Sequence, residues 1–168
     1  TLTASHNPPN YNGIKFNPSD GAPASTEIAS LIENKANRYL HEPLPAAKKE
    51  GIVDTVNIIP DFVESLIETI EHYTSLRLDK CQNLPIVIDP RHGAGIETWK
   101  EIETQAKLSQ LGFVHDEEDA YFGHMDPNPN NPENLSALRS KIQDCQAVLG
   151  VANDPDADRH ILLDEKGQ

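Results

Sequence analysis

The sequence predicts an α/β fold made of layered α/β/α domains with mixed, largely parallel sheets. Short apolar runs rich in Ile, Val and Leu alternate along the chain with longer segments whose apolar residues recur every three or four positions. Turns rich in Gly, Pro, Asn and Asp separate these segments. Strands that alternate with helices in this way typically form a largely parallel sheet covered by helices.

The N-terminal part of the chain combines turns with one helix. Residues 1–23 are rich in Asn, Pro and Gly, and within them residues 14–16 predict a short strand. Ser25 or Thr26 can cap a helix whose apolar residues follow at helical spacing, and we expect that helix over about 25–41.

A polar connector with two prolines follows this helix, over residues 41–51. Polar, proline-containing connectors typically separate domains. We therefore expect the later part of a first domain over 1–45 and most of a second domain over 46–168.

The second expected domain alternates strands with helices. Pro60 suits the first turn of a helix, and Gly112 suits the end of one. In chain order we expect a strand at 52–58, a helix from Pro60, a strand at 86–88, a helix from the glycine turn at 93–95 to Leu111, a strand at 113–114, a helix from Pro132 or Asn134 to Asp144, and strands at 147–151 and 161–163.

The charge balance excludes two classes of partner. The 168 residues carry a net charge of −13, from 14 basic and 27 acidic side chains. Nucleic acids and anionic membranes need a basic face, so we expect neither as a partner. No apolar stretch of spanning length and no signal peptide is present in the sequence, and we expect a cytoplasmic protein.

Three aspartates at alternate positions carry the strongest chemical signal. Asp154, Asp156 and Asp158 follow directly after an expected strand, and ligands commonly bind at that end of such a sheet. Alternate spacing can turn three carboxylates toward one point, where they repel each other unless a cation lies between them. Oxygen ligands favour Mg²⁺ or Ca²⁺, and Arg159 adds a fork suited to phosphate. This pattern indicates a Mg²⁺ site for phosphoryl chemistry.

Two other interpretations of the aspartates stay open on the residues alone. Together with Glu165, they occupy four ligand positions of an EF-hand, but Arg159 stands where that loop needs Gly. A non-catalytic Ca²⁺-binding module would also place helices on both sides of the loop. The remaining alternative is a solvated acidic turn.

Two further motifs allow a functional and a structural interpretation. Ser5 precedes His6 on a tight turn, where it is either a nucleophile or a turn-capping residue, and Lys15 could reach back across the loop as an acid/base. The glycine turn at 93–95 could cradle a phosphate at a helix N-terminus, but we favour a tight strand-to-helix connection.

Residues 3–8, Thr-Ala-Ser-His-Asn-Pro, and the following Asn-Gly-Ile-Lys at 12–15 resemble the phosphoserine loop of the α-D-phosphohexomutases. Residues 154–159, Asp-Pro-Asp-Ala-Asp-Arg, resemble their metal loop, although many relatives have Gly in place of Pro155. The order of the motifs also matches, and the likeness is greatest to bacterial phosphoglucomutases.

This resemblance implies a role for each matching residue. Ser5 would carry the phosphoryl group, and Lys15 would be the acid/base on the sugar hydroxyl. His6 would be a second proton carrier or an orienting group, and Arg159 would hold the phosphoserine. The metal ligands would be Asp154, Asp156 and Asp158 together with the phosphate on Ser5.

The implied reaction interconverts glucose 1-phosphate and glucose 6-phosphate. It passes through a hexose 1,6-bisphosphate, so that Mg²⁺ and glucose 1,6-bisphosphate are the expected cofactor and activator. The resemblance also implies a fragment of a four-domain enzyme with little or no mutase activity alone. A phosphomannomutase or dual-specificity enzyme is the alternative of the same class, and a metal-dependent phosphatase is a third possibility.

Overall fold

The computed structural model describes residues 1–42, 51 and 54–168, which divide into two compact units. The first unit consists of Thr1–Ala4 and Asn12–Val56. The second consists of Ser5–Tyr11 and Asn57–Gln168, so it contains both Ser5 and the aspartate loop. The domain boundary expected near residue 45 lies outside the described residues.

The described residues of the first unit form one helix and a short antiparallel contact. Helix α1 spans Thr26–Tyr39, and the Ser25 hydroxyl accepts the backbone N–H of Ile28, which confirms the expected cap. The expected strand at 14–16 is reduced to an isolated bridge between Leu2 and Ile14.

The described part of the second unit contains a four-stranded mixed sheet with the order β2-β1-β3-β4. The central pair is β1 and β3, which are parallel, and β2 is parallel to β1. Only β4 runs antiparallel, beside β3. The strands are β1 (Ile86–Asp89), β2 (Leu111–Phe113), β3 (Leu149–Asn153) and β4 (His160–Asp164). This confirms the expected fold class.

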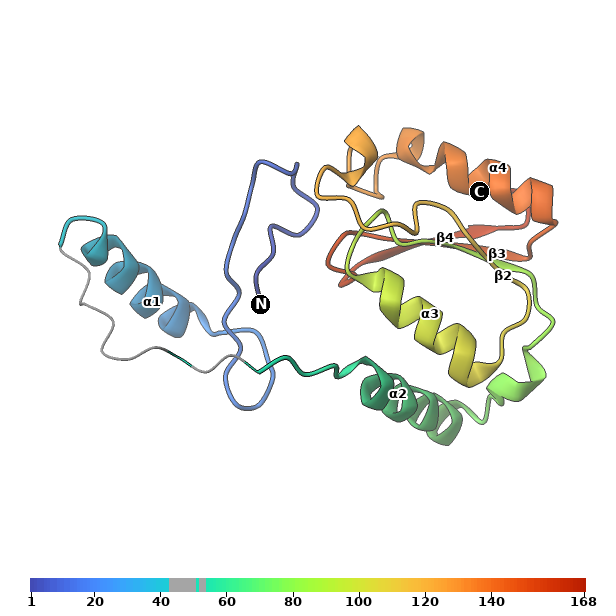
Figure 1. Ribbon diagram of the computed structural model, residues 1–168, viewed down its shortest axis with the longest axis horizontal. Coiled ribbons are helices and arrows are strands. Elements are labelled where there is room, and N and C mark those ends of the chain that lie inside the picture. Colours follow the sequence, from blue (N-terminus) through green and yellow to red (C-terminus); the bar gives the residue numbers. More distant parts are fainter. Residues whose placement is uncertain (43–50, 52–53) are drawn as a thin grey trace. The chain divides into compact units, whose positions relative to one another are not determined.

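Helices cover both faces of this sheet (Figure 1). Helix α4 (Ser136–Cys145) lies on one face and α3 (Gly95–Ala106) on the other. Successive strand residues point to opposite faces, and Val87 and Ile88 are both fully buried, so each face of β1 is covered. The core on the α4 side contains Val87, Leu135, Leu138, Ile142, Ala147, Ala152 and Leu163.

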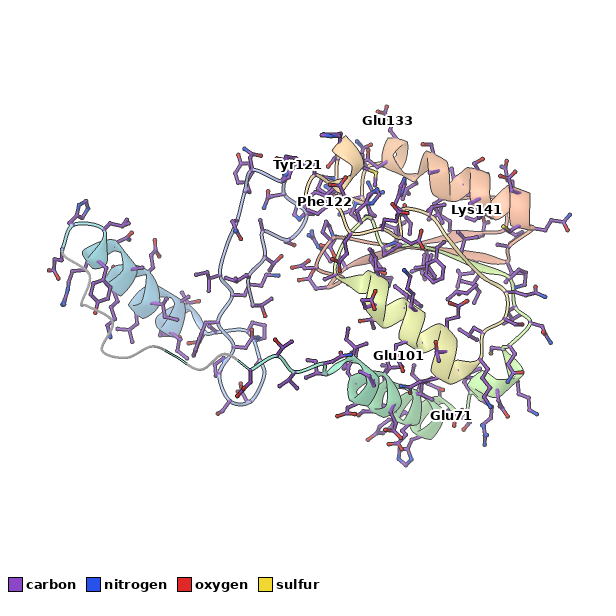
Figure 2. All side chains as sticks on the ribbon, in the orientation of Figure 1. Glu71, Glu101, Tyr121, Phe122, Glu133 and Lys141 are labelled. Carbon is purple, nitrogen blue, oxygen red and sulfur yellow. The ribbon has the colours of Figure 1, made fainter. Side chains whose placement is uncertain are left out.

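Helix α2 (Ile59–Thr74) packs against α3. Pro60 lies in its first turn, as expected, and Val63 is its one buried residue. The side-chain amide of Gln105 on α3 donates to the Pro60 carbonyl at 3.0 Å and to the Glu101 carboxylate at 2.7 Å. Figure 2 marks Glu101 on α3 beside α2, which carries Glu71.

The expected strand at 52–58 is wrong for the residues that the structure describes. Residues 52–53 lie outside the description, and the described residues 54–58 form no strand. Val56 and Ile58 are largely exposed. An apolar run becomes a strand only where another strand pairs with it.

The expected end of the helix after the glycine turn is also wrong. Helix α3 ends at Ala106, because Lys107 adopts a left-handed conformation with φ 55°. Gly112 is not the cap but lies in the middle of β2. Three short 3₁₀ helices complete the described elements, at Leu78–Lys80, Phe122–His124 and Pro132–Leu135, and the last of these leads into α4.

Candidate metal and nucleophile site

The aspartate loop is the tight connection between β3 and β4. Strand β3 ends at Asn153, which pairs with His160 at the start of β4. Between them the Ala157 N–H donates to the Asp154 carbonyl at 2.9 Å, and Ala157 has φ 58°. The loop therefore folds back on itself beyond the carboxyl end of β3, where the sequence places it.

The three aspartate side chains converge on one point. One carboxylate oxygen from each of Asp154, Asp156 and Asp158 lies within 4.8 Å of the others. Among the described residues, no other group of three His, Cys, Asp or Glu side chains does so. Asp154 is fully buried, whereas the Asp158 side chain is 51% exposed, so the cluster opens toward solvent on one side. An all-oxygen donor set of this kind fits Mg²⁺ or Ca²⁺.

Strands flank this loop on both sides. An EF-hand needs a helix before and after its calcium loop. The EF-hand interpretation, and with it the calcium module built on it, is therefore wrong.

Ser5 lies against the aspartate cluster, although 149 residues separate it from Asp154. Its Oγ donates to Asp154 Oδ2 at 3.3 Å. Its backbone has φ 56°, a left-handed conformation that is uncommon for a residue other than Gly. Such strain persists where the surrounding contacts enforce it, and it is concentrated at functional sites.

Arg159 connects Ser5 to Asp154. Its Nη2 donates to Ser5 Oγ at 2.7 Å and to Asp154 Oδ2 at 2.6 Å, and its Nε donates to the same carboxylate oxygen at 3.0 Å. Its backbone N–H donates to Asp154 Oδ1 at 3.0 Å. Desolvation opposes the charged guanidinium, but the hydrogen bond and negative charge of Asp154 outweigh it and raise the pKa of Arg159. The buried Asp154 charge is thus compensated by a group that also reaches the serine.

His6 joins the same group through Arg159. Its Nδ1 lies within hydrogen-bonding distance of Arg159 Nη2. A guanidinium only donates hydrogen bonds, so Nδ1 is the acceptor and the ring presents its other nitrogen elsewhere. This contact is consistent with an orienting His6, and its role as a second proton carrier stays a prediction.

Lys15 belongs to the first unit. Its backbone N–H donates to the Thr1 carbonyl at 2.9 Å, and its own carbonyl accepts from the Thr1 amino group at 2.9 Å. Its expected role as an acid/base stays a prediction.

Two residues of the site were not expected from the sequence. The Trp99 indole N–H, on α3, donates to Asn153 Oδ1 at 2.7 Å, and Asn153 Nδ2 donates to the Arg159 carbonyl at 3.2 Å. Trp99 lies in an amphipathic helix, where a core position is the ordinary expectation. Only the position of Asn153, between a strand and the aspartates, offered a signal.

Comparison with protein families matches nearly all of the described chain. Residues 60–167 match the model for phosphoglucomutase/phosphomannomutase, alpha/beta/alpha domain II, and residues 1–42 match the model for domain I. The chain belongs to the phosphoglucomutase/phosphomannomutase family. The resemblance seen in the two motifs is thereby confirmed, and the family's enzymes are mutases.

Individual relatives agree with this family. A phosphoglucomutase/phosphomannomutase of Thermococcus kodakarensis is 32% identical over 171 residues, which cover 99% of this chain and 35% of the relative. A phosphoglucosamine mutase of Methanococcus maripaludis is 29% identical over 170 residues, covering 99% and 36%. The crystal structure of a family protein from Burkholderia thailandensis superposes with a TM-score of 0.69 at 25% identity, covering 99% of this chain and 33% of that one. The chain spans about a third of the length of these relatives.

Proposed function

We propose that this chain carries the phosphoserine and metal loops of a phosphohexomutase that interconverts glucose 1-phosphate and glucose 6-phosphate. The observation that carries the proposal is the contact of Ser5 Oγ with both Asp154 and Arg159. A nucleophile, a carboxylate cluster and a guanidinium are the groups that phosphoryl transfer through a serine requires.

The residues of the site divide the work of the transfer. Ser5 gives its phosphoryl group to the free hydroxyl of a hexose phosphate, and the O–P bond to Ser5 breaks as the bond to the sugar forms. The hydroxyl proton passes to a base, for which Lys15 and His6 are the candidates. The resulting 1,6-bisphosphate turns over and returns its other phosphate to Ser5.

Arg159 holds the phosphorylated side chain in this scheme. Its Nη2 already donates to Ser5 Oγ, and a guanidinium binds phosphate oxygens with two parallel hydrogen bonds. Asp154, Asp156 and Asp158 would hold Mg²⁺, with the Ser5 phosphate as a further ligand. A bound Mg²⁺ would neutralise charge on the transferring phosphoryl group.

The identity of the sugar in the substrate is a separate part of the proposal. The names of the relatives include glucose, mannose and glucosamine phosphates as substrate classes. The motif residues around Ser5 and the aspartates favour glucose, and a phosphomannomutase or dual-specificity enzyme is the alternative.

Phosphate transfer to Ser5 tests the proposal directly. The chain is incubated with glucose 1,6-bisphosphate and Mg²⁺, and peptides are analysed by mass spectrometry for the site of phosphorylation. We expect phosphate on Ser5, abolished by chelation of the metal. The Ser5→Ala variant should take up no phosphate, whereas Ser19→Ala, which removes an exposed serine of the same N-terminal segment, should behave as the wild type.

Two results would count against the proposal. Phosphate on other serines but never on Ser5 would exclude Ser5 as the carrier. Release of inorganic phosphate without a phosphoserine would favour a metal-dependent phosphatase. Parallel reactions with mannose and glucosamine 1,6-bisphosphates compare the sugars.

A further inference from the structure

The connection between β1 and α3 lies directly against the aspartate loop. The Ala94 N–H, at the start of α3, donates to the Pro155 carbonyl at 2.8 Å. Pro155 is itself buried, between Asp154 and Asp156. Two segments that are far apart in the sequence thus share a backbone hydrogen bond at the centre of the proposed metal loop.

Gly93 allows this close approach. A methyl group on Gly93 would lie 2.5 Å from Pro155 Cα and 2.8 Å from the Pro155 carbonyl carbon, and closer still to the oxygen. All three are backbone atoms, so a side chain at this position would have to displace the loop itself. At Gly95 the added methyl would lie 3.3 Å from Ala157 Cβ, on the same loop.

Trp99 holds the other end of the loop from the same helix. Its indole N–H binds Asn153 Oδ1, and Asn153 in turn donates to the Arg159 carbonyl. The loop is therefore attached to α3 both at its centre, through Pro155, and at the residue where β3 ends.

These contacts favour the tight strand-to-helix connection for the glycine turn. The Gly93 N–H donates to the Pro90 carbonyl at 2.9 Å, and the Ala94 N–H is used by Pro155. Because these two donors are occupied and Gly93 faces the loop backbone, Gly93 serves a close backbone approach.

We propose that Gly93 and Trp99 are positioning residues for the aspartate loop, and that they set its affinity for a divalent cation. Three carboxylates repel one another, so an aspartate loop relaxes outward unless its backbone is held. Attachment to a core helix keeps the carboxylate oxygens close before the cation arrives, which reduces the cost of ordering them on binding. This inference rests on the proposed metal site.

Titration calorimetry with Mg²⁺ on the full chain tests the inference without any assay of activity. We expect the Gly93→Ala variant to bind Mg²⁺ at least about tenfold more weakly than the wild type, as is typical when the support of metal ligands is lost. Trp99→Phe keeps most of the ring volume and removes the indole donor, and should weaken binding severalfold, by about the factor expected for one lost hydrogen bond.

Two glycines in the same unit provide matched controls. In Gly112→Ala the new methyl group meets its nearest neighbour at 3.6 Å, an ordinary contact, so both stability and Mg²⁺ affinity should be retained. In Gly150→Ala the methyl group would lie 2.5 Å from Ile142 Cδ1, in the core under α4. That variant should lose stability but keep its Mg²⁺ affinity at temperatures where it is folded.

The outcomes test the positioning role of Gly93 and Trp99 separately from the proposed metal site. Wild-type affinity in Gly93→Ala, or an equal loss in Gly150→Ala, would overturn the positioning role and leave the metal site intact. No Mg²⁺ binding by the wild type would overturn both. If Gly93→Ala does not fold, Trp99→Phe decides, because unchanged affinity in that variant overturns the inference and weaker binding supports it.

Discussion

Arg159 Nη2 lies 2.7 Å from Ser5 Oγ, across 154 residues of sequence, while the same nitrogen donates to the buried Asp154 carboxylate. A single guanidinium thus connects the proposed nucleophile with the proposed metal loop. The two motifs are within reach of each other because Ser5–Tyr11 packs with the unit that carries the sheet. The following predictions concern this group and the structure that supports it.

Replacement of Arg159 should slow phosphorylation of Ser5. Arg159→Met removes hydrogen bonds to a charged partner, each with a net contribution of about 1.5–3 kcal/mol. We expect the rate of phosphate transfer from glucose 1,6-bisphosphate to Ser5 to fall by roughly 10- to 100-fold, as this range implies. Rapid quenching followed by mass spectrometry of the Ser5 peptide measures this rate.

The Arg159→Lys variant shows, in the same experiment, how much of the effect is due to the positive charge of Arg159 and how much to the shape of its guanidinium. Lysine keeps the positive charge but lacks the planar fork that reaches Ser5 and Asp154 together. An intermediate rate is expected. Wild-type phosphorylation in Arg159→Met would show that the guanidinium has no part in holding the phosphoserine.

Asp158→Asn should weaken Mg²⁺ binding with little effect on folding. Asp158 is the most accessible of the three carboxylates, and its ion pair with Arg159 at 3.5 Å is half exposed, so it contributes little to stability. Loss of a residue that only supports a metal ligand typically weakens metal binding at least about tenfold. Loss of Asp158, a proposed direct ligand, should therefore weaken Mg²⁺ binding by at least this factor.

Calorimetric titration and a thermal melt without metal test this pair of expectations. Asp144→Asn, on the exposed face of α4, is the control for the loss of one negative charge. Equal Mg²⁺ affinity in Asp158→Asn and the wild type would remove Asp158 from the proposed ligand set.

The sequence predicted those features of the fold and the site that depend only on residues close together in the chain. The alternate aspartates converge because a tight turn of six residues brings them together, and Ser25 and Pro60 begin helices because caps act within one turn. The proximity of Ser5 to Asp154 could be expected only from the family resemblance, since no local pattern connects residues so far apart.

The expectations that failed depend on distant partners. Residues 54–58 include the β-branched Thr55, Val56 and Ile58, which favour a strand, but a strand exists only where another pairs with it. The end of α3 at Ala106 follows from a left-handed Lys107, which its residue type does not indicate. The approach of Gly93 to Pro155 arises from the packing of two loops at one edge of the sheet, and a glycine in a turn does not reveal its neighbour.

Arg91 should be among the most important residues for the stability of the second unit. Its side chain is fully buried, where it pairs with Asp89 at 3.5 Å and donates to the carbonyls of Asn134 at 2.9 Å and Asp126 at 2.5 Å. Burial lowers the pKa of Arg91, and the charges of Asp89 and Asp126 oppose this effect. Arg91→Met leaves Asp89 without this partner and should cost about 3 kcal/mol, a typical loss for a broken buried pair.

Urea unfolding followed by tryptophan fluorescence measures this loss, because Trp99 is the single tryptophan of the chain and lies in the same unit. Arg77→Met is the matched control: the Arg77 side chain is 63% exposed, and its ion pairs should contribute less than about 1 kcal/mol. Equal stabilities of the two variants would mean that the buried network around Arg91 is not required.

Asp119 should stabilise the loop before α4 only while its carboxylate is charged. Its two oxygens accept the backbone N–H groups of Tyr121 at 2.8 Å and Gly123 at 3.0 Å, and these hydrogen bonds lower the pKa of Asp119 (Figure 2 labels Tyr121 and Phe122 on this loop). Gly123 has φ 62° and Phe122 has φ 52°, so the carboxylate holds a left-handed turn. Asp119→Ala removes both acceptors and should lower the midpoint of thermal unfolding at neutral pH.

The pH dependence of this loss follows from the direction of the shift. A lowered pKa in the folded state means that the stabilisation is fully present above the ordinary aspartate pKa of about 3.9 and disappears as the pH falls through the lower, folded value. The difference in unfolding midpoint between the wild type and Asp119→Ala should therefore be constant from neutral pH down to about pH 5 and shrink below about pH 4. Thermal melts across this range measure it, and a difference that grows on acidification would contradict the role assigned to the two backbone hydrogen bonds.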